Sequence, residues 1–382
     1  MPGLSIDTLP DLPESPQEAR ITDKFDYPVA YNFAFAGFGQ GGGRIANTFA
    51  SMGYSRVCAV NTTIADLSEL PLPETSKLDV GNARGAGKDP EAAQLLVSDK
   101  GGDIFDLYKR TWGNDVDHVF ICVAAAGGTG AGCFAKGLEV AREYMTSLKK
   151  DVKVGVIVAL PKDSEGQRYA INAMHTFKQL RSLGKISPLI FIDNEQYRLL
   201  YPTTPATQEK PRSNIATAQL LHAFNRIAGL KSSDMGGATF DRADFAKLLD
   251  SGIVAFAAHK ITEWASPSDF SGPIRDRLKQ NCLASIDISR GSQAGLLYGL
   301  GGKAYDEVTV EHLDHGTQAM TRLMGNAGKP TTVFTGMYQL EGGDVISVMA
   351  MIGGLPWPTG RIEALGAAAG IRGDELADFL KV

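Results

Sequence analysis

A strand that runs directly into a glycine-rich turn constrains this chain more than any other stretch. The apolar residues 119–123 are followed by Ala-Ala-Ala-Gly-Gly-Thr-Gly-Ala-Gly at 124–132, and the later pattern predicts a helix beginning near Cys133. Residues without side chains let backbone N–H groups close on a phosphate, and a helix N-terminus directs its positive dipole end there. We therefore expect a nucleotide at this turn.

The composition narrows the class of protein. With 382 residues, 43% of them hydrophobic, the chain can bury a large core and is expected to form two domains. Its net charge of −5 disfavours direct binding of nucleic acid. The sequence has no long uncharged apolar run and no signal-peptide pattern, which predicts a soluble cytoplasmic protein without a membrane partner. Four cysteines without paired metal spacing are expected to be reduced structural thiols: Cys58, Cys122, Cys133 and Cys282.

The order of the expected elements predicts an α/β fold with a doubly wound parallel sheet. Strands are expected at 30–36, 57–60, 119–123, 152–160 and 188–192, and helices separate them. In such sheets ligands bind at the carboxyl ends of the strands. The helical pattern of 90–110 is expected to break at Gly101-Gly102.

A smaller α+β domain is expected to follow a connecting helix that spans roughly 214–230. Its last two strands, 331–337 and 344–352, are predicted to pair as a hairpin across Glu-Gly-Gly at 341–343. The predicted organisation is a flexible N-terminal arm (1–28), a nucleotide-binding domain (29–212), a connecting helix (213–233), a C-terminal domain (234–355) and a tail (356–382).

Two glycine motifs resemble other nucleotide-binding loops, but each lacks an expected residue. The spacing Gly-x-Gly-x-x-Gly at 37–42 fits a dinucleotide fingerprint, which needs an acid at the end of the second strand, where this chain has Asn61. The stretch 85–89 resembles part of a P-loop, but Asn82 replaces its first glycine and Asp89 its final hydroxyl residue. A nicotinamide enzyme and a Walker lysine are therefore disfavoured.

Taken in order over residues 30–355, the motifs resemble the tubulin/FtsZ superfamily of filament-forming GTPases. Gly-Gln-Gly-Gly-Gly-Arg at 39–44 is similar to its first phosphate loop, 61–62 and 83–91 are similar to the next two loops, and 126–132 to the tubulin signature. The form of 39–43, 126–130 and 160–162, with Asp-x-x-Asp at 241–244, resembles the TubZ branch of plasmid and phage tubulins most. Ala126 and Ala131 depart from the signature, and an arginine of FtsZ is shifted to Arg168.

The resemblance implies GTP/GDP and Mg²⁺ as cofactors and a head-to-tail homopolymer whose active site is split between successive subunits. It implies that Asp241 and Asp244 of one subunit act on the nucleotide of the next, with Asp244 polarising the attacking water. Gln40 is the implied metal ligand, and no other metal is expected. The implied nucleotide-binding residues are Gly39, Gln40, Gly41, Gly42, Gly43, Arg44, Asn61, Gly87, Gly127, Gly128, Thr129, Gly130, Gly132, Glu165, Arg168, Asn194 and Asn214.

Simpler interpretations of four of these residues stay open. Asp241 is also a favourable helix N-cap, and Gln40 also fits a solvated loop amide. Asn194 either reads a guanine edge through its donor and acceptor or forms a turn. Glu165 either holds the ribose hydroxyls or is an acid in the first turn of a helix.

The predicted function is a GTPase whose filaments move or position plasmid or phage DNA, through an adaptor protein. An FtsZ-like role in cell division or membrane remodelling is the alternative, and the acidic tail 374–381 faintly resembles the FtsZ anchor peptide. A nucleotide-binding regulator that never polymerises is a third hypothesis, which the presence of Asp241 and Asp244 disfavours.

Overall fold

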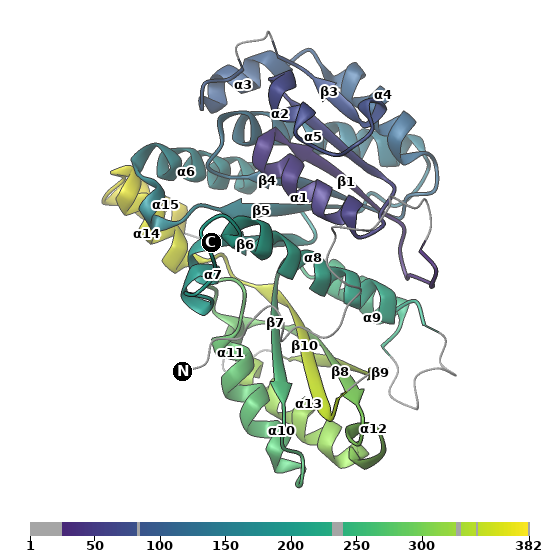
Figure 1. The fold of residues 1–382 in the computed structure, drawn as a ribbon. Coiled ribbons are helices and arrows are strands. Elements are labelled where there is room, and N and C mark those ends of the chain that lie inside the picture. Colours follow the sequence, from purple (N-terminus) through teal and green to yellow (C-terminus); the bar gives the residue numbers. More distant parts are fainter. Residues whose placement is uncertain (1–24, 82–84, 231–239, 326–329, 341–342, 381–382) are drawn as a thin grey trace. The chain divides into compact units, whose positions relative to one another are not determined.

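A computed structural model describes residues 25–81, 85–230, 240–325, 330–340 and 343–380 (Figure 1). The chain divides into two compact units. The amino-terminal unit contains 25–26, 31–195 and 359–380, and the carboxy-terminal unit contains 27–30 and 196–358, apart from the residues that are not described. Most of the expected arm 1–28 lies outside the described residues, and the expected domain boundaries stay predictions.

The amino-terminal unit is built on six parallel strands in the order β3-β2-β1-β4-β5-β6. They are β1 (Phe33–Phe38), β2 (Val57–Asn61), β3 (Lys77–Asp79), β4 (His118–Ala124), β5 (Val154–Leu160) and β6 (Leu189–Asp193). Apart from short β3 and the last residue of β4, every strand residue is buried, as expected for a parallel sheet covered on both faces. The doubly wound α/β fold is therefore confirmed.

Helices connect and cover these strands. They are α1 (Gly39–Ser51), α2 (Ile64–Ser68), α3 (Pro90–Val97), α4 (Gly101–Trp112), α5 (Gly128–Ser147), α6 (Gln167–Ser182), α14 (Thr359–Ala369) and α15 (Asp374–Leu380). The short helix α7 (Asn194–Leu200) crosses from one unit to the other.

The helix after β4 begins earlier than expected. We predicted a start near Cys133, but α5 begins at Gly128, so most of the glycine-rich turn is its first turn. Glycine has a low helix propensity, which hides such a start in the sequence. The pair Gly101-Gly102 likewise opens α4, and the break between α3 and α4 lies at 98–100.

Aromatic residues fill the core beside β1. Phe35 of β1 stacks on Phe49 of α1 with 3.9 Å between the ring centroids. Phe120 of β4 also stacks on Phe35, with 5.4 Å between the centroids. Tyr54 meets Phe35 edge-on at 5.2 Å. Such rings bury large areas and favour these geometries, so they fix α1 against the two central strands.

The carboxy-terminal unit has a four-stranded part of the sheet in the order β7-β10-β8-β9. The strands are β7 (Ile253–Ile261), β8 (Gln293–Gly301), β9 (Thr332–Leu340) and β10 (Val345–Leu355). The expected hairpin of the last two strands is wrong. β10 lies between β7 and β8, antiparallel to both, whereas β9 pairs in parallel with β8. The turn signal was local, and pairing with β8 over nine residues decided the topology instead.

The helices of this unit are α8 (Glu209–Ile227), α9 (Arg242–Leu249), α10 (Ser268–Gly272), a π-helical turn (Pro273–Arg277), α11 (Leu278–Gln280), α12 (Ala304–Glu307) and α13 (Val310–Met324). We expected the connecting helix to begin near residue 214, but α8 already begins at Glu209. Pro211 is tolerated there because N–H groups of a first helical turn have no intrahelical acceptor. Among the described residues, no helix is long and apolar enough to cross a membrane.

Candidate nucleotide-binding site

Two helix N-termini converge at the carboxyl ends of the neighbouring strands β1 and β4. The helix α1 begins directly after β1, and only 125–127 separate β4 from α5. Gly39 has φ +69°, and a Cβ atom added to it would lie 2.7 Å from the backbone nitrogen of Gly130. Two positive dipole ends and their free N–H groups therefore face one place, which is a favourable arrangement for a polyphosphate.

The turn 85–89 closes on the start of α5. A Cβ atom on Gly128 would lie 2.6 Å from the nitrogen of Asp89, so the two backbones are in direct contact. The buried Asn172 fixes this arrangement, because its Nδ2 donates to the carbonyls of Lys88 (3.1 Å) and Ala126 (3.0 Å). The Nη2 of Arg168 also donates to the Lys88 carbonyl, at 2.9 Å. The predicted phosphate contact Arg168 thus braces the loop in this structure.

The end of β2 is tied to the start of α5 by two hydroxyl groups. The Oγ1 atoms of Thr62 and Thr129 lie 2.7 Å apart. Asn61 is buried, and its Oδ1 accepts from the nitrogen of Thr62 at 2.7 Å while its Nδ2 donates to Asp66 at 3.1 Å. Asn61 and Thr129 therefore lie beside the convergent helices, and their role in nucleotide binding stays a prediction.

Two carboxylates that the sequence analysis missed lie beside Gln40. Its Nε2 donates to Asp66 (3.3 Å) and Glu69 (3.4 Å), and Arg44 pairs with Glu69 at 3.0 Å. No spacing motif marks these acids. Mg²⁺ binds nucleotide sites through one or two carboxylates together with phosphates and waters. Asp66, Glu69 and the carbonyl of Gln40 offer such oxygens, so the residues fit the ion, although the described residues contain no ready-made cluster of three metal-ligating side chains.

The glycines of the site fall into two groups. Besides Gly39 and Gly128, added Cβ atoms would overlap backbone or side-chain atoms of neighbouring elements at four further predicted nucleotide-binding positions, which packing alone explains: Gly41, Gly42, Gly43 and Gly132. By contrast, a Cβ on Gly127 would meet nothing closer than 3.7 Å, and one on Gly87 nothing within 4 Å. The open sides of Gly127 and Gly87 are the ones available to a ligand.

The residues predicted for the ribose and base follow β5 and β6. Glu165 is half-buried in a 3₁₀ turn (Asp163–Glu165) between β5 and α6. Asn194 is buried, and its Nδ2 donates to the carbonyl of Leu160 at 2.9 Å, so part of its amide is already used by the backbone. Asn214 lies on α8, in the other unit.

The predicted catalytic loop lies in the carboxy-terminal unit. Asp241 is the N-cap of α9, and its Oδ1 accepts from the nitrogens of Ala243 (2.8 Å) and Asp244 (2.9 Å). Asp244 is half-buried, 3.4 Å from the Nζ of Lys247. The buried Phe240 precedes this turn and packs edge-on against Phe224 of α8. The capping role is therefore observed, and it leaves a catalytic role untested.

Cys122 lies in β4, two residues before its end, and is fully buried. Burial raises the pKa of Cys122 well above its usual value and that of Cys133 to about 12. All four cysteines are free and buried, as expected for structural thiols.

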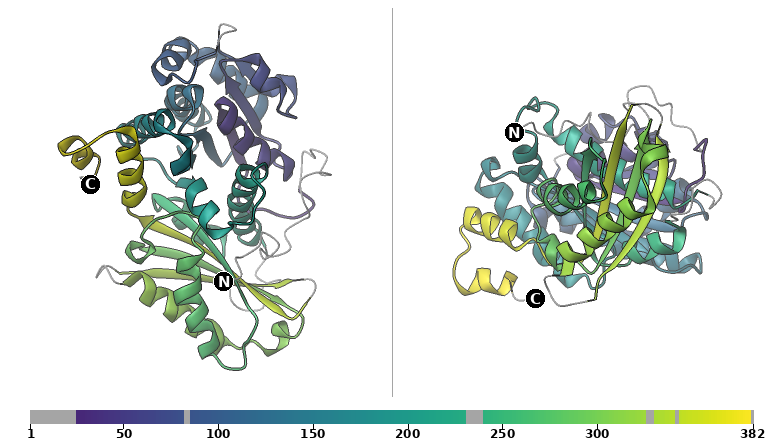
Figure 2. Two further views of the ribbon diagram at one scale, coloured as in Figure 1. Left: turned by 60° about the vertical axis from the view of Figure 1, so that its left-hand side comes forward. Right: turned by 90° about the horizontal axis from the view of Figure 1, so that it is seen from below.

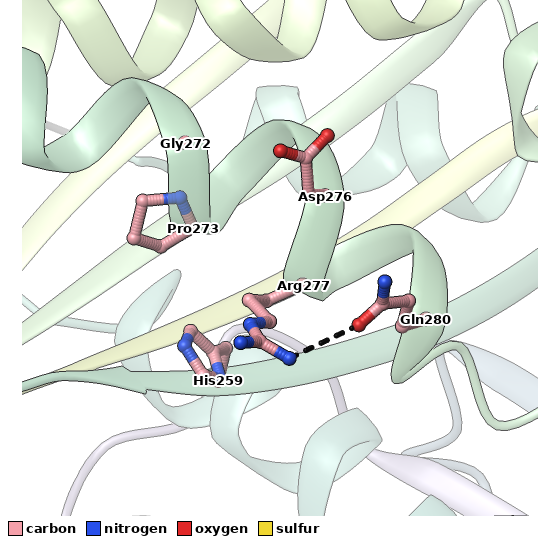
Figure 3. Close-up of a pocket in the computed structure, with 6 residues that line it drawn as sticks. All are labelled: His259, Gly272, Pro273, Asp276, Arg277 and Gln280. Carbon is pink, nitrogen blue, oxygen red and sulfur yellow. Dashed lines mark hydrogen bonds between the residues drawn. The ribbon is translucent and has the colours of Figure 1, made fainter. Parts of the chain in front are cut away.

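A separate hollow of about 530 Å³ lies in the carboxy-terminal unit, outside every predicted site (Figure 3). It lies between β7 and the π-helical turn and is lined by His259, Gly272, Pro273, Asp276, Arg277 and Gln280. Arg277 donates to the Oε1 of Gln280 at 3.3 Å, while Asp276 points away from both and pairs with Arg275. Burial, with Arg277 nearby, lowers the pKa of His259. Asp276 and His259 thus have partners outside the lining, Arg275 and Asn281, and the lining side chains do not converge on one point.

Sequence comparison relates the chain to tubulin-like proteins. A family model described as "Tubulin like" matches residues 94–279. TubZ of Bacillus cereus is 24% identical over 247 residues, which cover 60% of this chain and 55% of that protein. The match thus spans little more than half the length of this relative. CetZ2 of Haloferax volcanii is 24% identical over 370 residues, 90% of each chain.

Solved structures show the same fold. A GTPγS-bound protofilament of CetZ2 from Haloferax volcanii has a TM-score of 0.71 and 20% identity, with 92% of this chain and 99% of that chain covered. A GTPγS-form protofilament of TubZ from Bacillus thuringiensis serovar israelensis has the same TM-score at 16% identity, with 92% and 93% covered. The chain is as similar to CetZ as to TubZ proteins. These comparisons therefore do not support the expected closer similarity to the TubZ branch.

Proposed function

We propose that this chain, which is similar to tubulin-like proteins over residues 94–279, is a GTPase that binds GTP at the convergent N-termini of α1 and α5 and hydrolyses it on self-assembly. The observation that carries the proposal is the approach of Gly39 to the backbone nitrogen of Gly130. It leaves two helix dipoles directed at one anion. Guanine nucleotide as the ligand is supported by the CetZ2 and TubZ structures, which hold GTPγS.

Binding in this proposal needs the backbone more than charged side chains. The N–H groups at the start of α5 and the open side of Gly127 would receive the phosphates. Mg²⁺, held by Asp66, Glu69 and Gln40, would offset the charge of the phosphate groups when bound. Glu165 would hold the ribose hydroxyls.

Hydrolysis in this proposal needs a second copy of the chain. Asp241 and Asp244 of that copy would face the terminal phosphate and orient a water, because phosphoryl transfer depends on positioning and charge rather than covalent help. A head-to-tail contact that does not close on itself produces a filament. The protofilaments of CetZ2 and TubZ support this mode of assembly.

Movement or positioning of plasmid or phage DNA is the cellular role we propose, in line with the similarity to TubZ. The net charge of −5 favours an adaptor protein over direct DNA contact. An FtsZ-like role in division or membrane remodelling is the second candidate, because the match to CetZ2, over 90% of both chains, is not confined to the TubZ branch. Co-purification of an adaptor that binds DNA would favour the first role, and recruitment to the division site the second.

The catalytic assignment is tested with substitutions that separate capping from charge. Asp241→Asn keeps an oxygen that can cap α9 but removes the carboxylate. Asp244→Asn removes the second carboxylate of the loop. We expect both variants to form GTP-dependent filaments, measured by sedimentation, and to lose at least about tenfold in hydrolysis rate, measured as phosphate release. Asp287→Asn, at the cap of another short helix, is the matched control. Normal hydrolysis by both variants would contradict the assignment.

A further inference from the structure

A buried arginine from the carboxy-terminal segment fastens two strand ends beside the predicted ribose site. Arg361 lies in the first turn of α14 and is only 5% exposed. Its Nη1 pairs with the carboxylate of Asp163, its Nη2 donates to the carbonyl of Pro161 at 2.7 Å, and its Nε lies 3.1 Å from the Oδ1 of Asp193. Arg361 is not among the predicted site residues.

The three partners belong to the ends of neighbouring parallel strands. Pro161 and Asp163 follow β5, Asp193 ends β6, and the two strands pair up to the register of Leu160 with Asp193. One planar guanidinium therefore spans both strand ends, a geometry that the fork of an arginine allows and a lysine cannot reproduce.

The partners of Arg361 are continuous with the turn that carries Glu165. The nitrogen of Asp163 donates to the Oε2 of Glu195 at 3.3 Å, and the nitrogen of Glu195 donates to Asp193 at 3.2 Å. Asp163 opens the 3₁₀ turn that ends at Glu165. Movement of Asp163 would therefore be passed to Glu165 through two peptide bonds.

The segment that carries Arg361 also packs on the helix after this turn. Figure 2 shows α14, in yellow, beside α6, and the Nε2 of Gln167, the first residue of α6, donates to the carbonyl of Ala369 at 3.4 Å. The helix that follows the turn of Glu165 is thus held by the same segment.

Stability alone is a weak reason for this cluster. Asp193 is 1% exposed, and burying an ion pair costs desolvation energy that offsets its Coulomb attraction. Apolar side chains in place of both Arg361 and Asp193 would pack α14 at no such cost. The arrangement is better explained by the need to hold the polar strand ends in one conformation.

We propose that Arg361 is a positioning residue for the nucleotide site and that it acts through the turn 161–166. It sets the turn that presents Glu165, so the affinity contributed by the ribose contact depends on the docking of α14. This inference rests on the proposed function, and it extends the site to a segment of the chain that contacts no nucleotide.

Three variants test the inference. Arg361→Gln removes the fork. Asp163→Asn removes only the charge of the exposed partner and leaves Arg361 with Asp193 and Pro161, so this variant is expected to fold. Arg372→Gln, at an exposed arginine of the same segment, is the matched control. Dissociation constants for GTP and 2′,3′-dideoxy-GTP are measured below the assembly concentration, with a thermal unfolding curve for each variant.

The ratio of the two dissociation constants distinguishes positioning from loss of structure. We expect the unmodified chain and Arg372→Gln to prefer GTP, and the other two variants to lose about tenfold in GTP affinity while binding the dideoxy nucleotide almost normally. Adding Glu165→Gln to Asp163→Asn should then cost little more, because both act on one contact. Equal dissociation constants for Asp163→Asn and the control would overturn this inference and would leave the proposed function standing. Failure of the unmodified chain to bind GTP would contradict the proposed function and the inference with it.

Discussion

Gly39→Ala is the substitution that most directly tests how α1 and α5 meet. Gly39 has φ +69°, a conformation that costs an alanine roughly 1–2 kcal/mol. The added Cβ would also lie 2.7 Å from the backbone nitrogen of Gly130, and that overlap adds roughly 1–3 kcal/mol because backbone atoms cannot rotate away. We expect a total loss of roughly 2–5 kcal/mol in the free energy of unfolding.

Gly184→Ala is a matched control for the backbone conformation. Gly184 has φ +71°, but an added Cβ there would meet nothing within 4 Å. Only the conformational cost of roughly 1–2 kcal/mol applies to it. The difference between the two variants therefore measures the overlap at the junction of the helices.

Urea unfolding of the nucleotide-free variants gives both free energies by linear extrapolation. Addition of GDP should raise the midpoint of the unmodified chain and of Gly184→Ala, because a ligand of the native state stabilises it, and should leave Gly39→Ala unchanged. Equal destabilisation of the two variants, with equal responses to GDP, would refute the close approach of the helices.

Three further predictions concern other parts of the molecule. Gly127→Ala should leave the unfolding midpoint within ~0.5 kcal/mol of normal but weaken GTP binding in a titration, because its added Cβ meets only a distant carbonyl and points into the proposed phosphate site; unchanged binding would argue that this side of the turn is not used. Cys122 and Cys133 should resist a thiol reagent at pH 8 in the native state and react in urea, because burial raises the pKa of both thiols; rapid native labelling of either would contradict their burial. Burial lowers the pKa of His222 from 6.5 to about 4, so the unfolded chain binds a proton first as the pH falls, and roughly 3 kcal/mol of stability should be lost between pH 6.5 and 4. Replacement of this histidine, whose Nε2 lies 2.8 Å from the hydroxyl of Tyr27, by glutamine should flatten that slope, and an unchanged slope would assign it to other groups.

The sequence was sufficient for the fold class because strong periodic signals agreed with one another. Buried runs such as 154–160, alternating with amphipathic helices, leave few arrangements other than a parallel sheet, and ligand-binding turns then fall at one edge. The resemblance to the tubulin/FtsZ superfamily rested on several motifs in a fixed order, and the comparisons confirm it.

Features that depend on distant partners could not be predicted in the same way. The turn at 341–343 resembled a hairpin, yet β9 pairs with β8, which local sequence does not encode. Glycines concealed the first turn of α5 because their helix propensity is low. Arg361 lies 198 residues after Asp163, and Asp66 is a single acid in a short helix, so neither has a recognisable motif.

The rate of GTP hydrolysis per molecule, measured against protein concentration, tests the central claim most directly. If the nucleotide is bound by one copy and cleaved with the acidic loop of another, the rate per molecule should be negligible at high dilution and should rise steeply above a threshold concentration at which filaments sediment. A rate per molecule that stays constant down to dilutions at which only monomers exist would contradict the account.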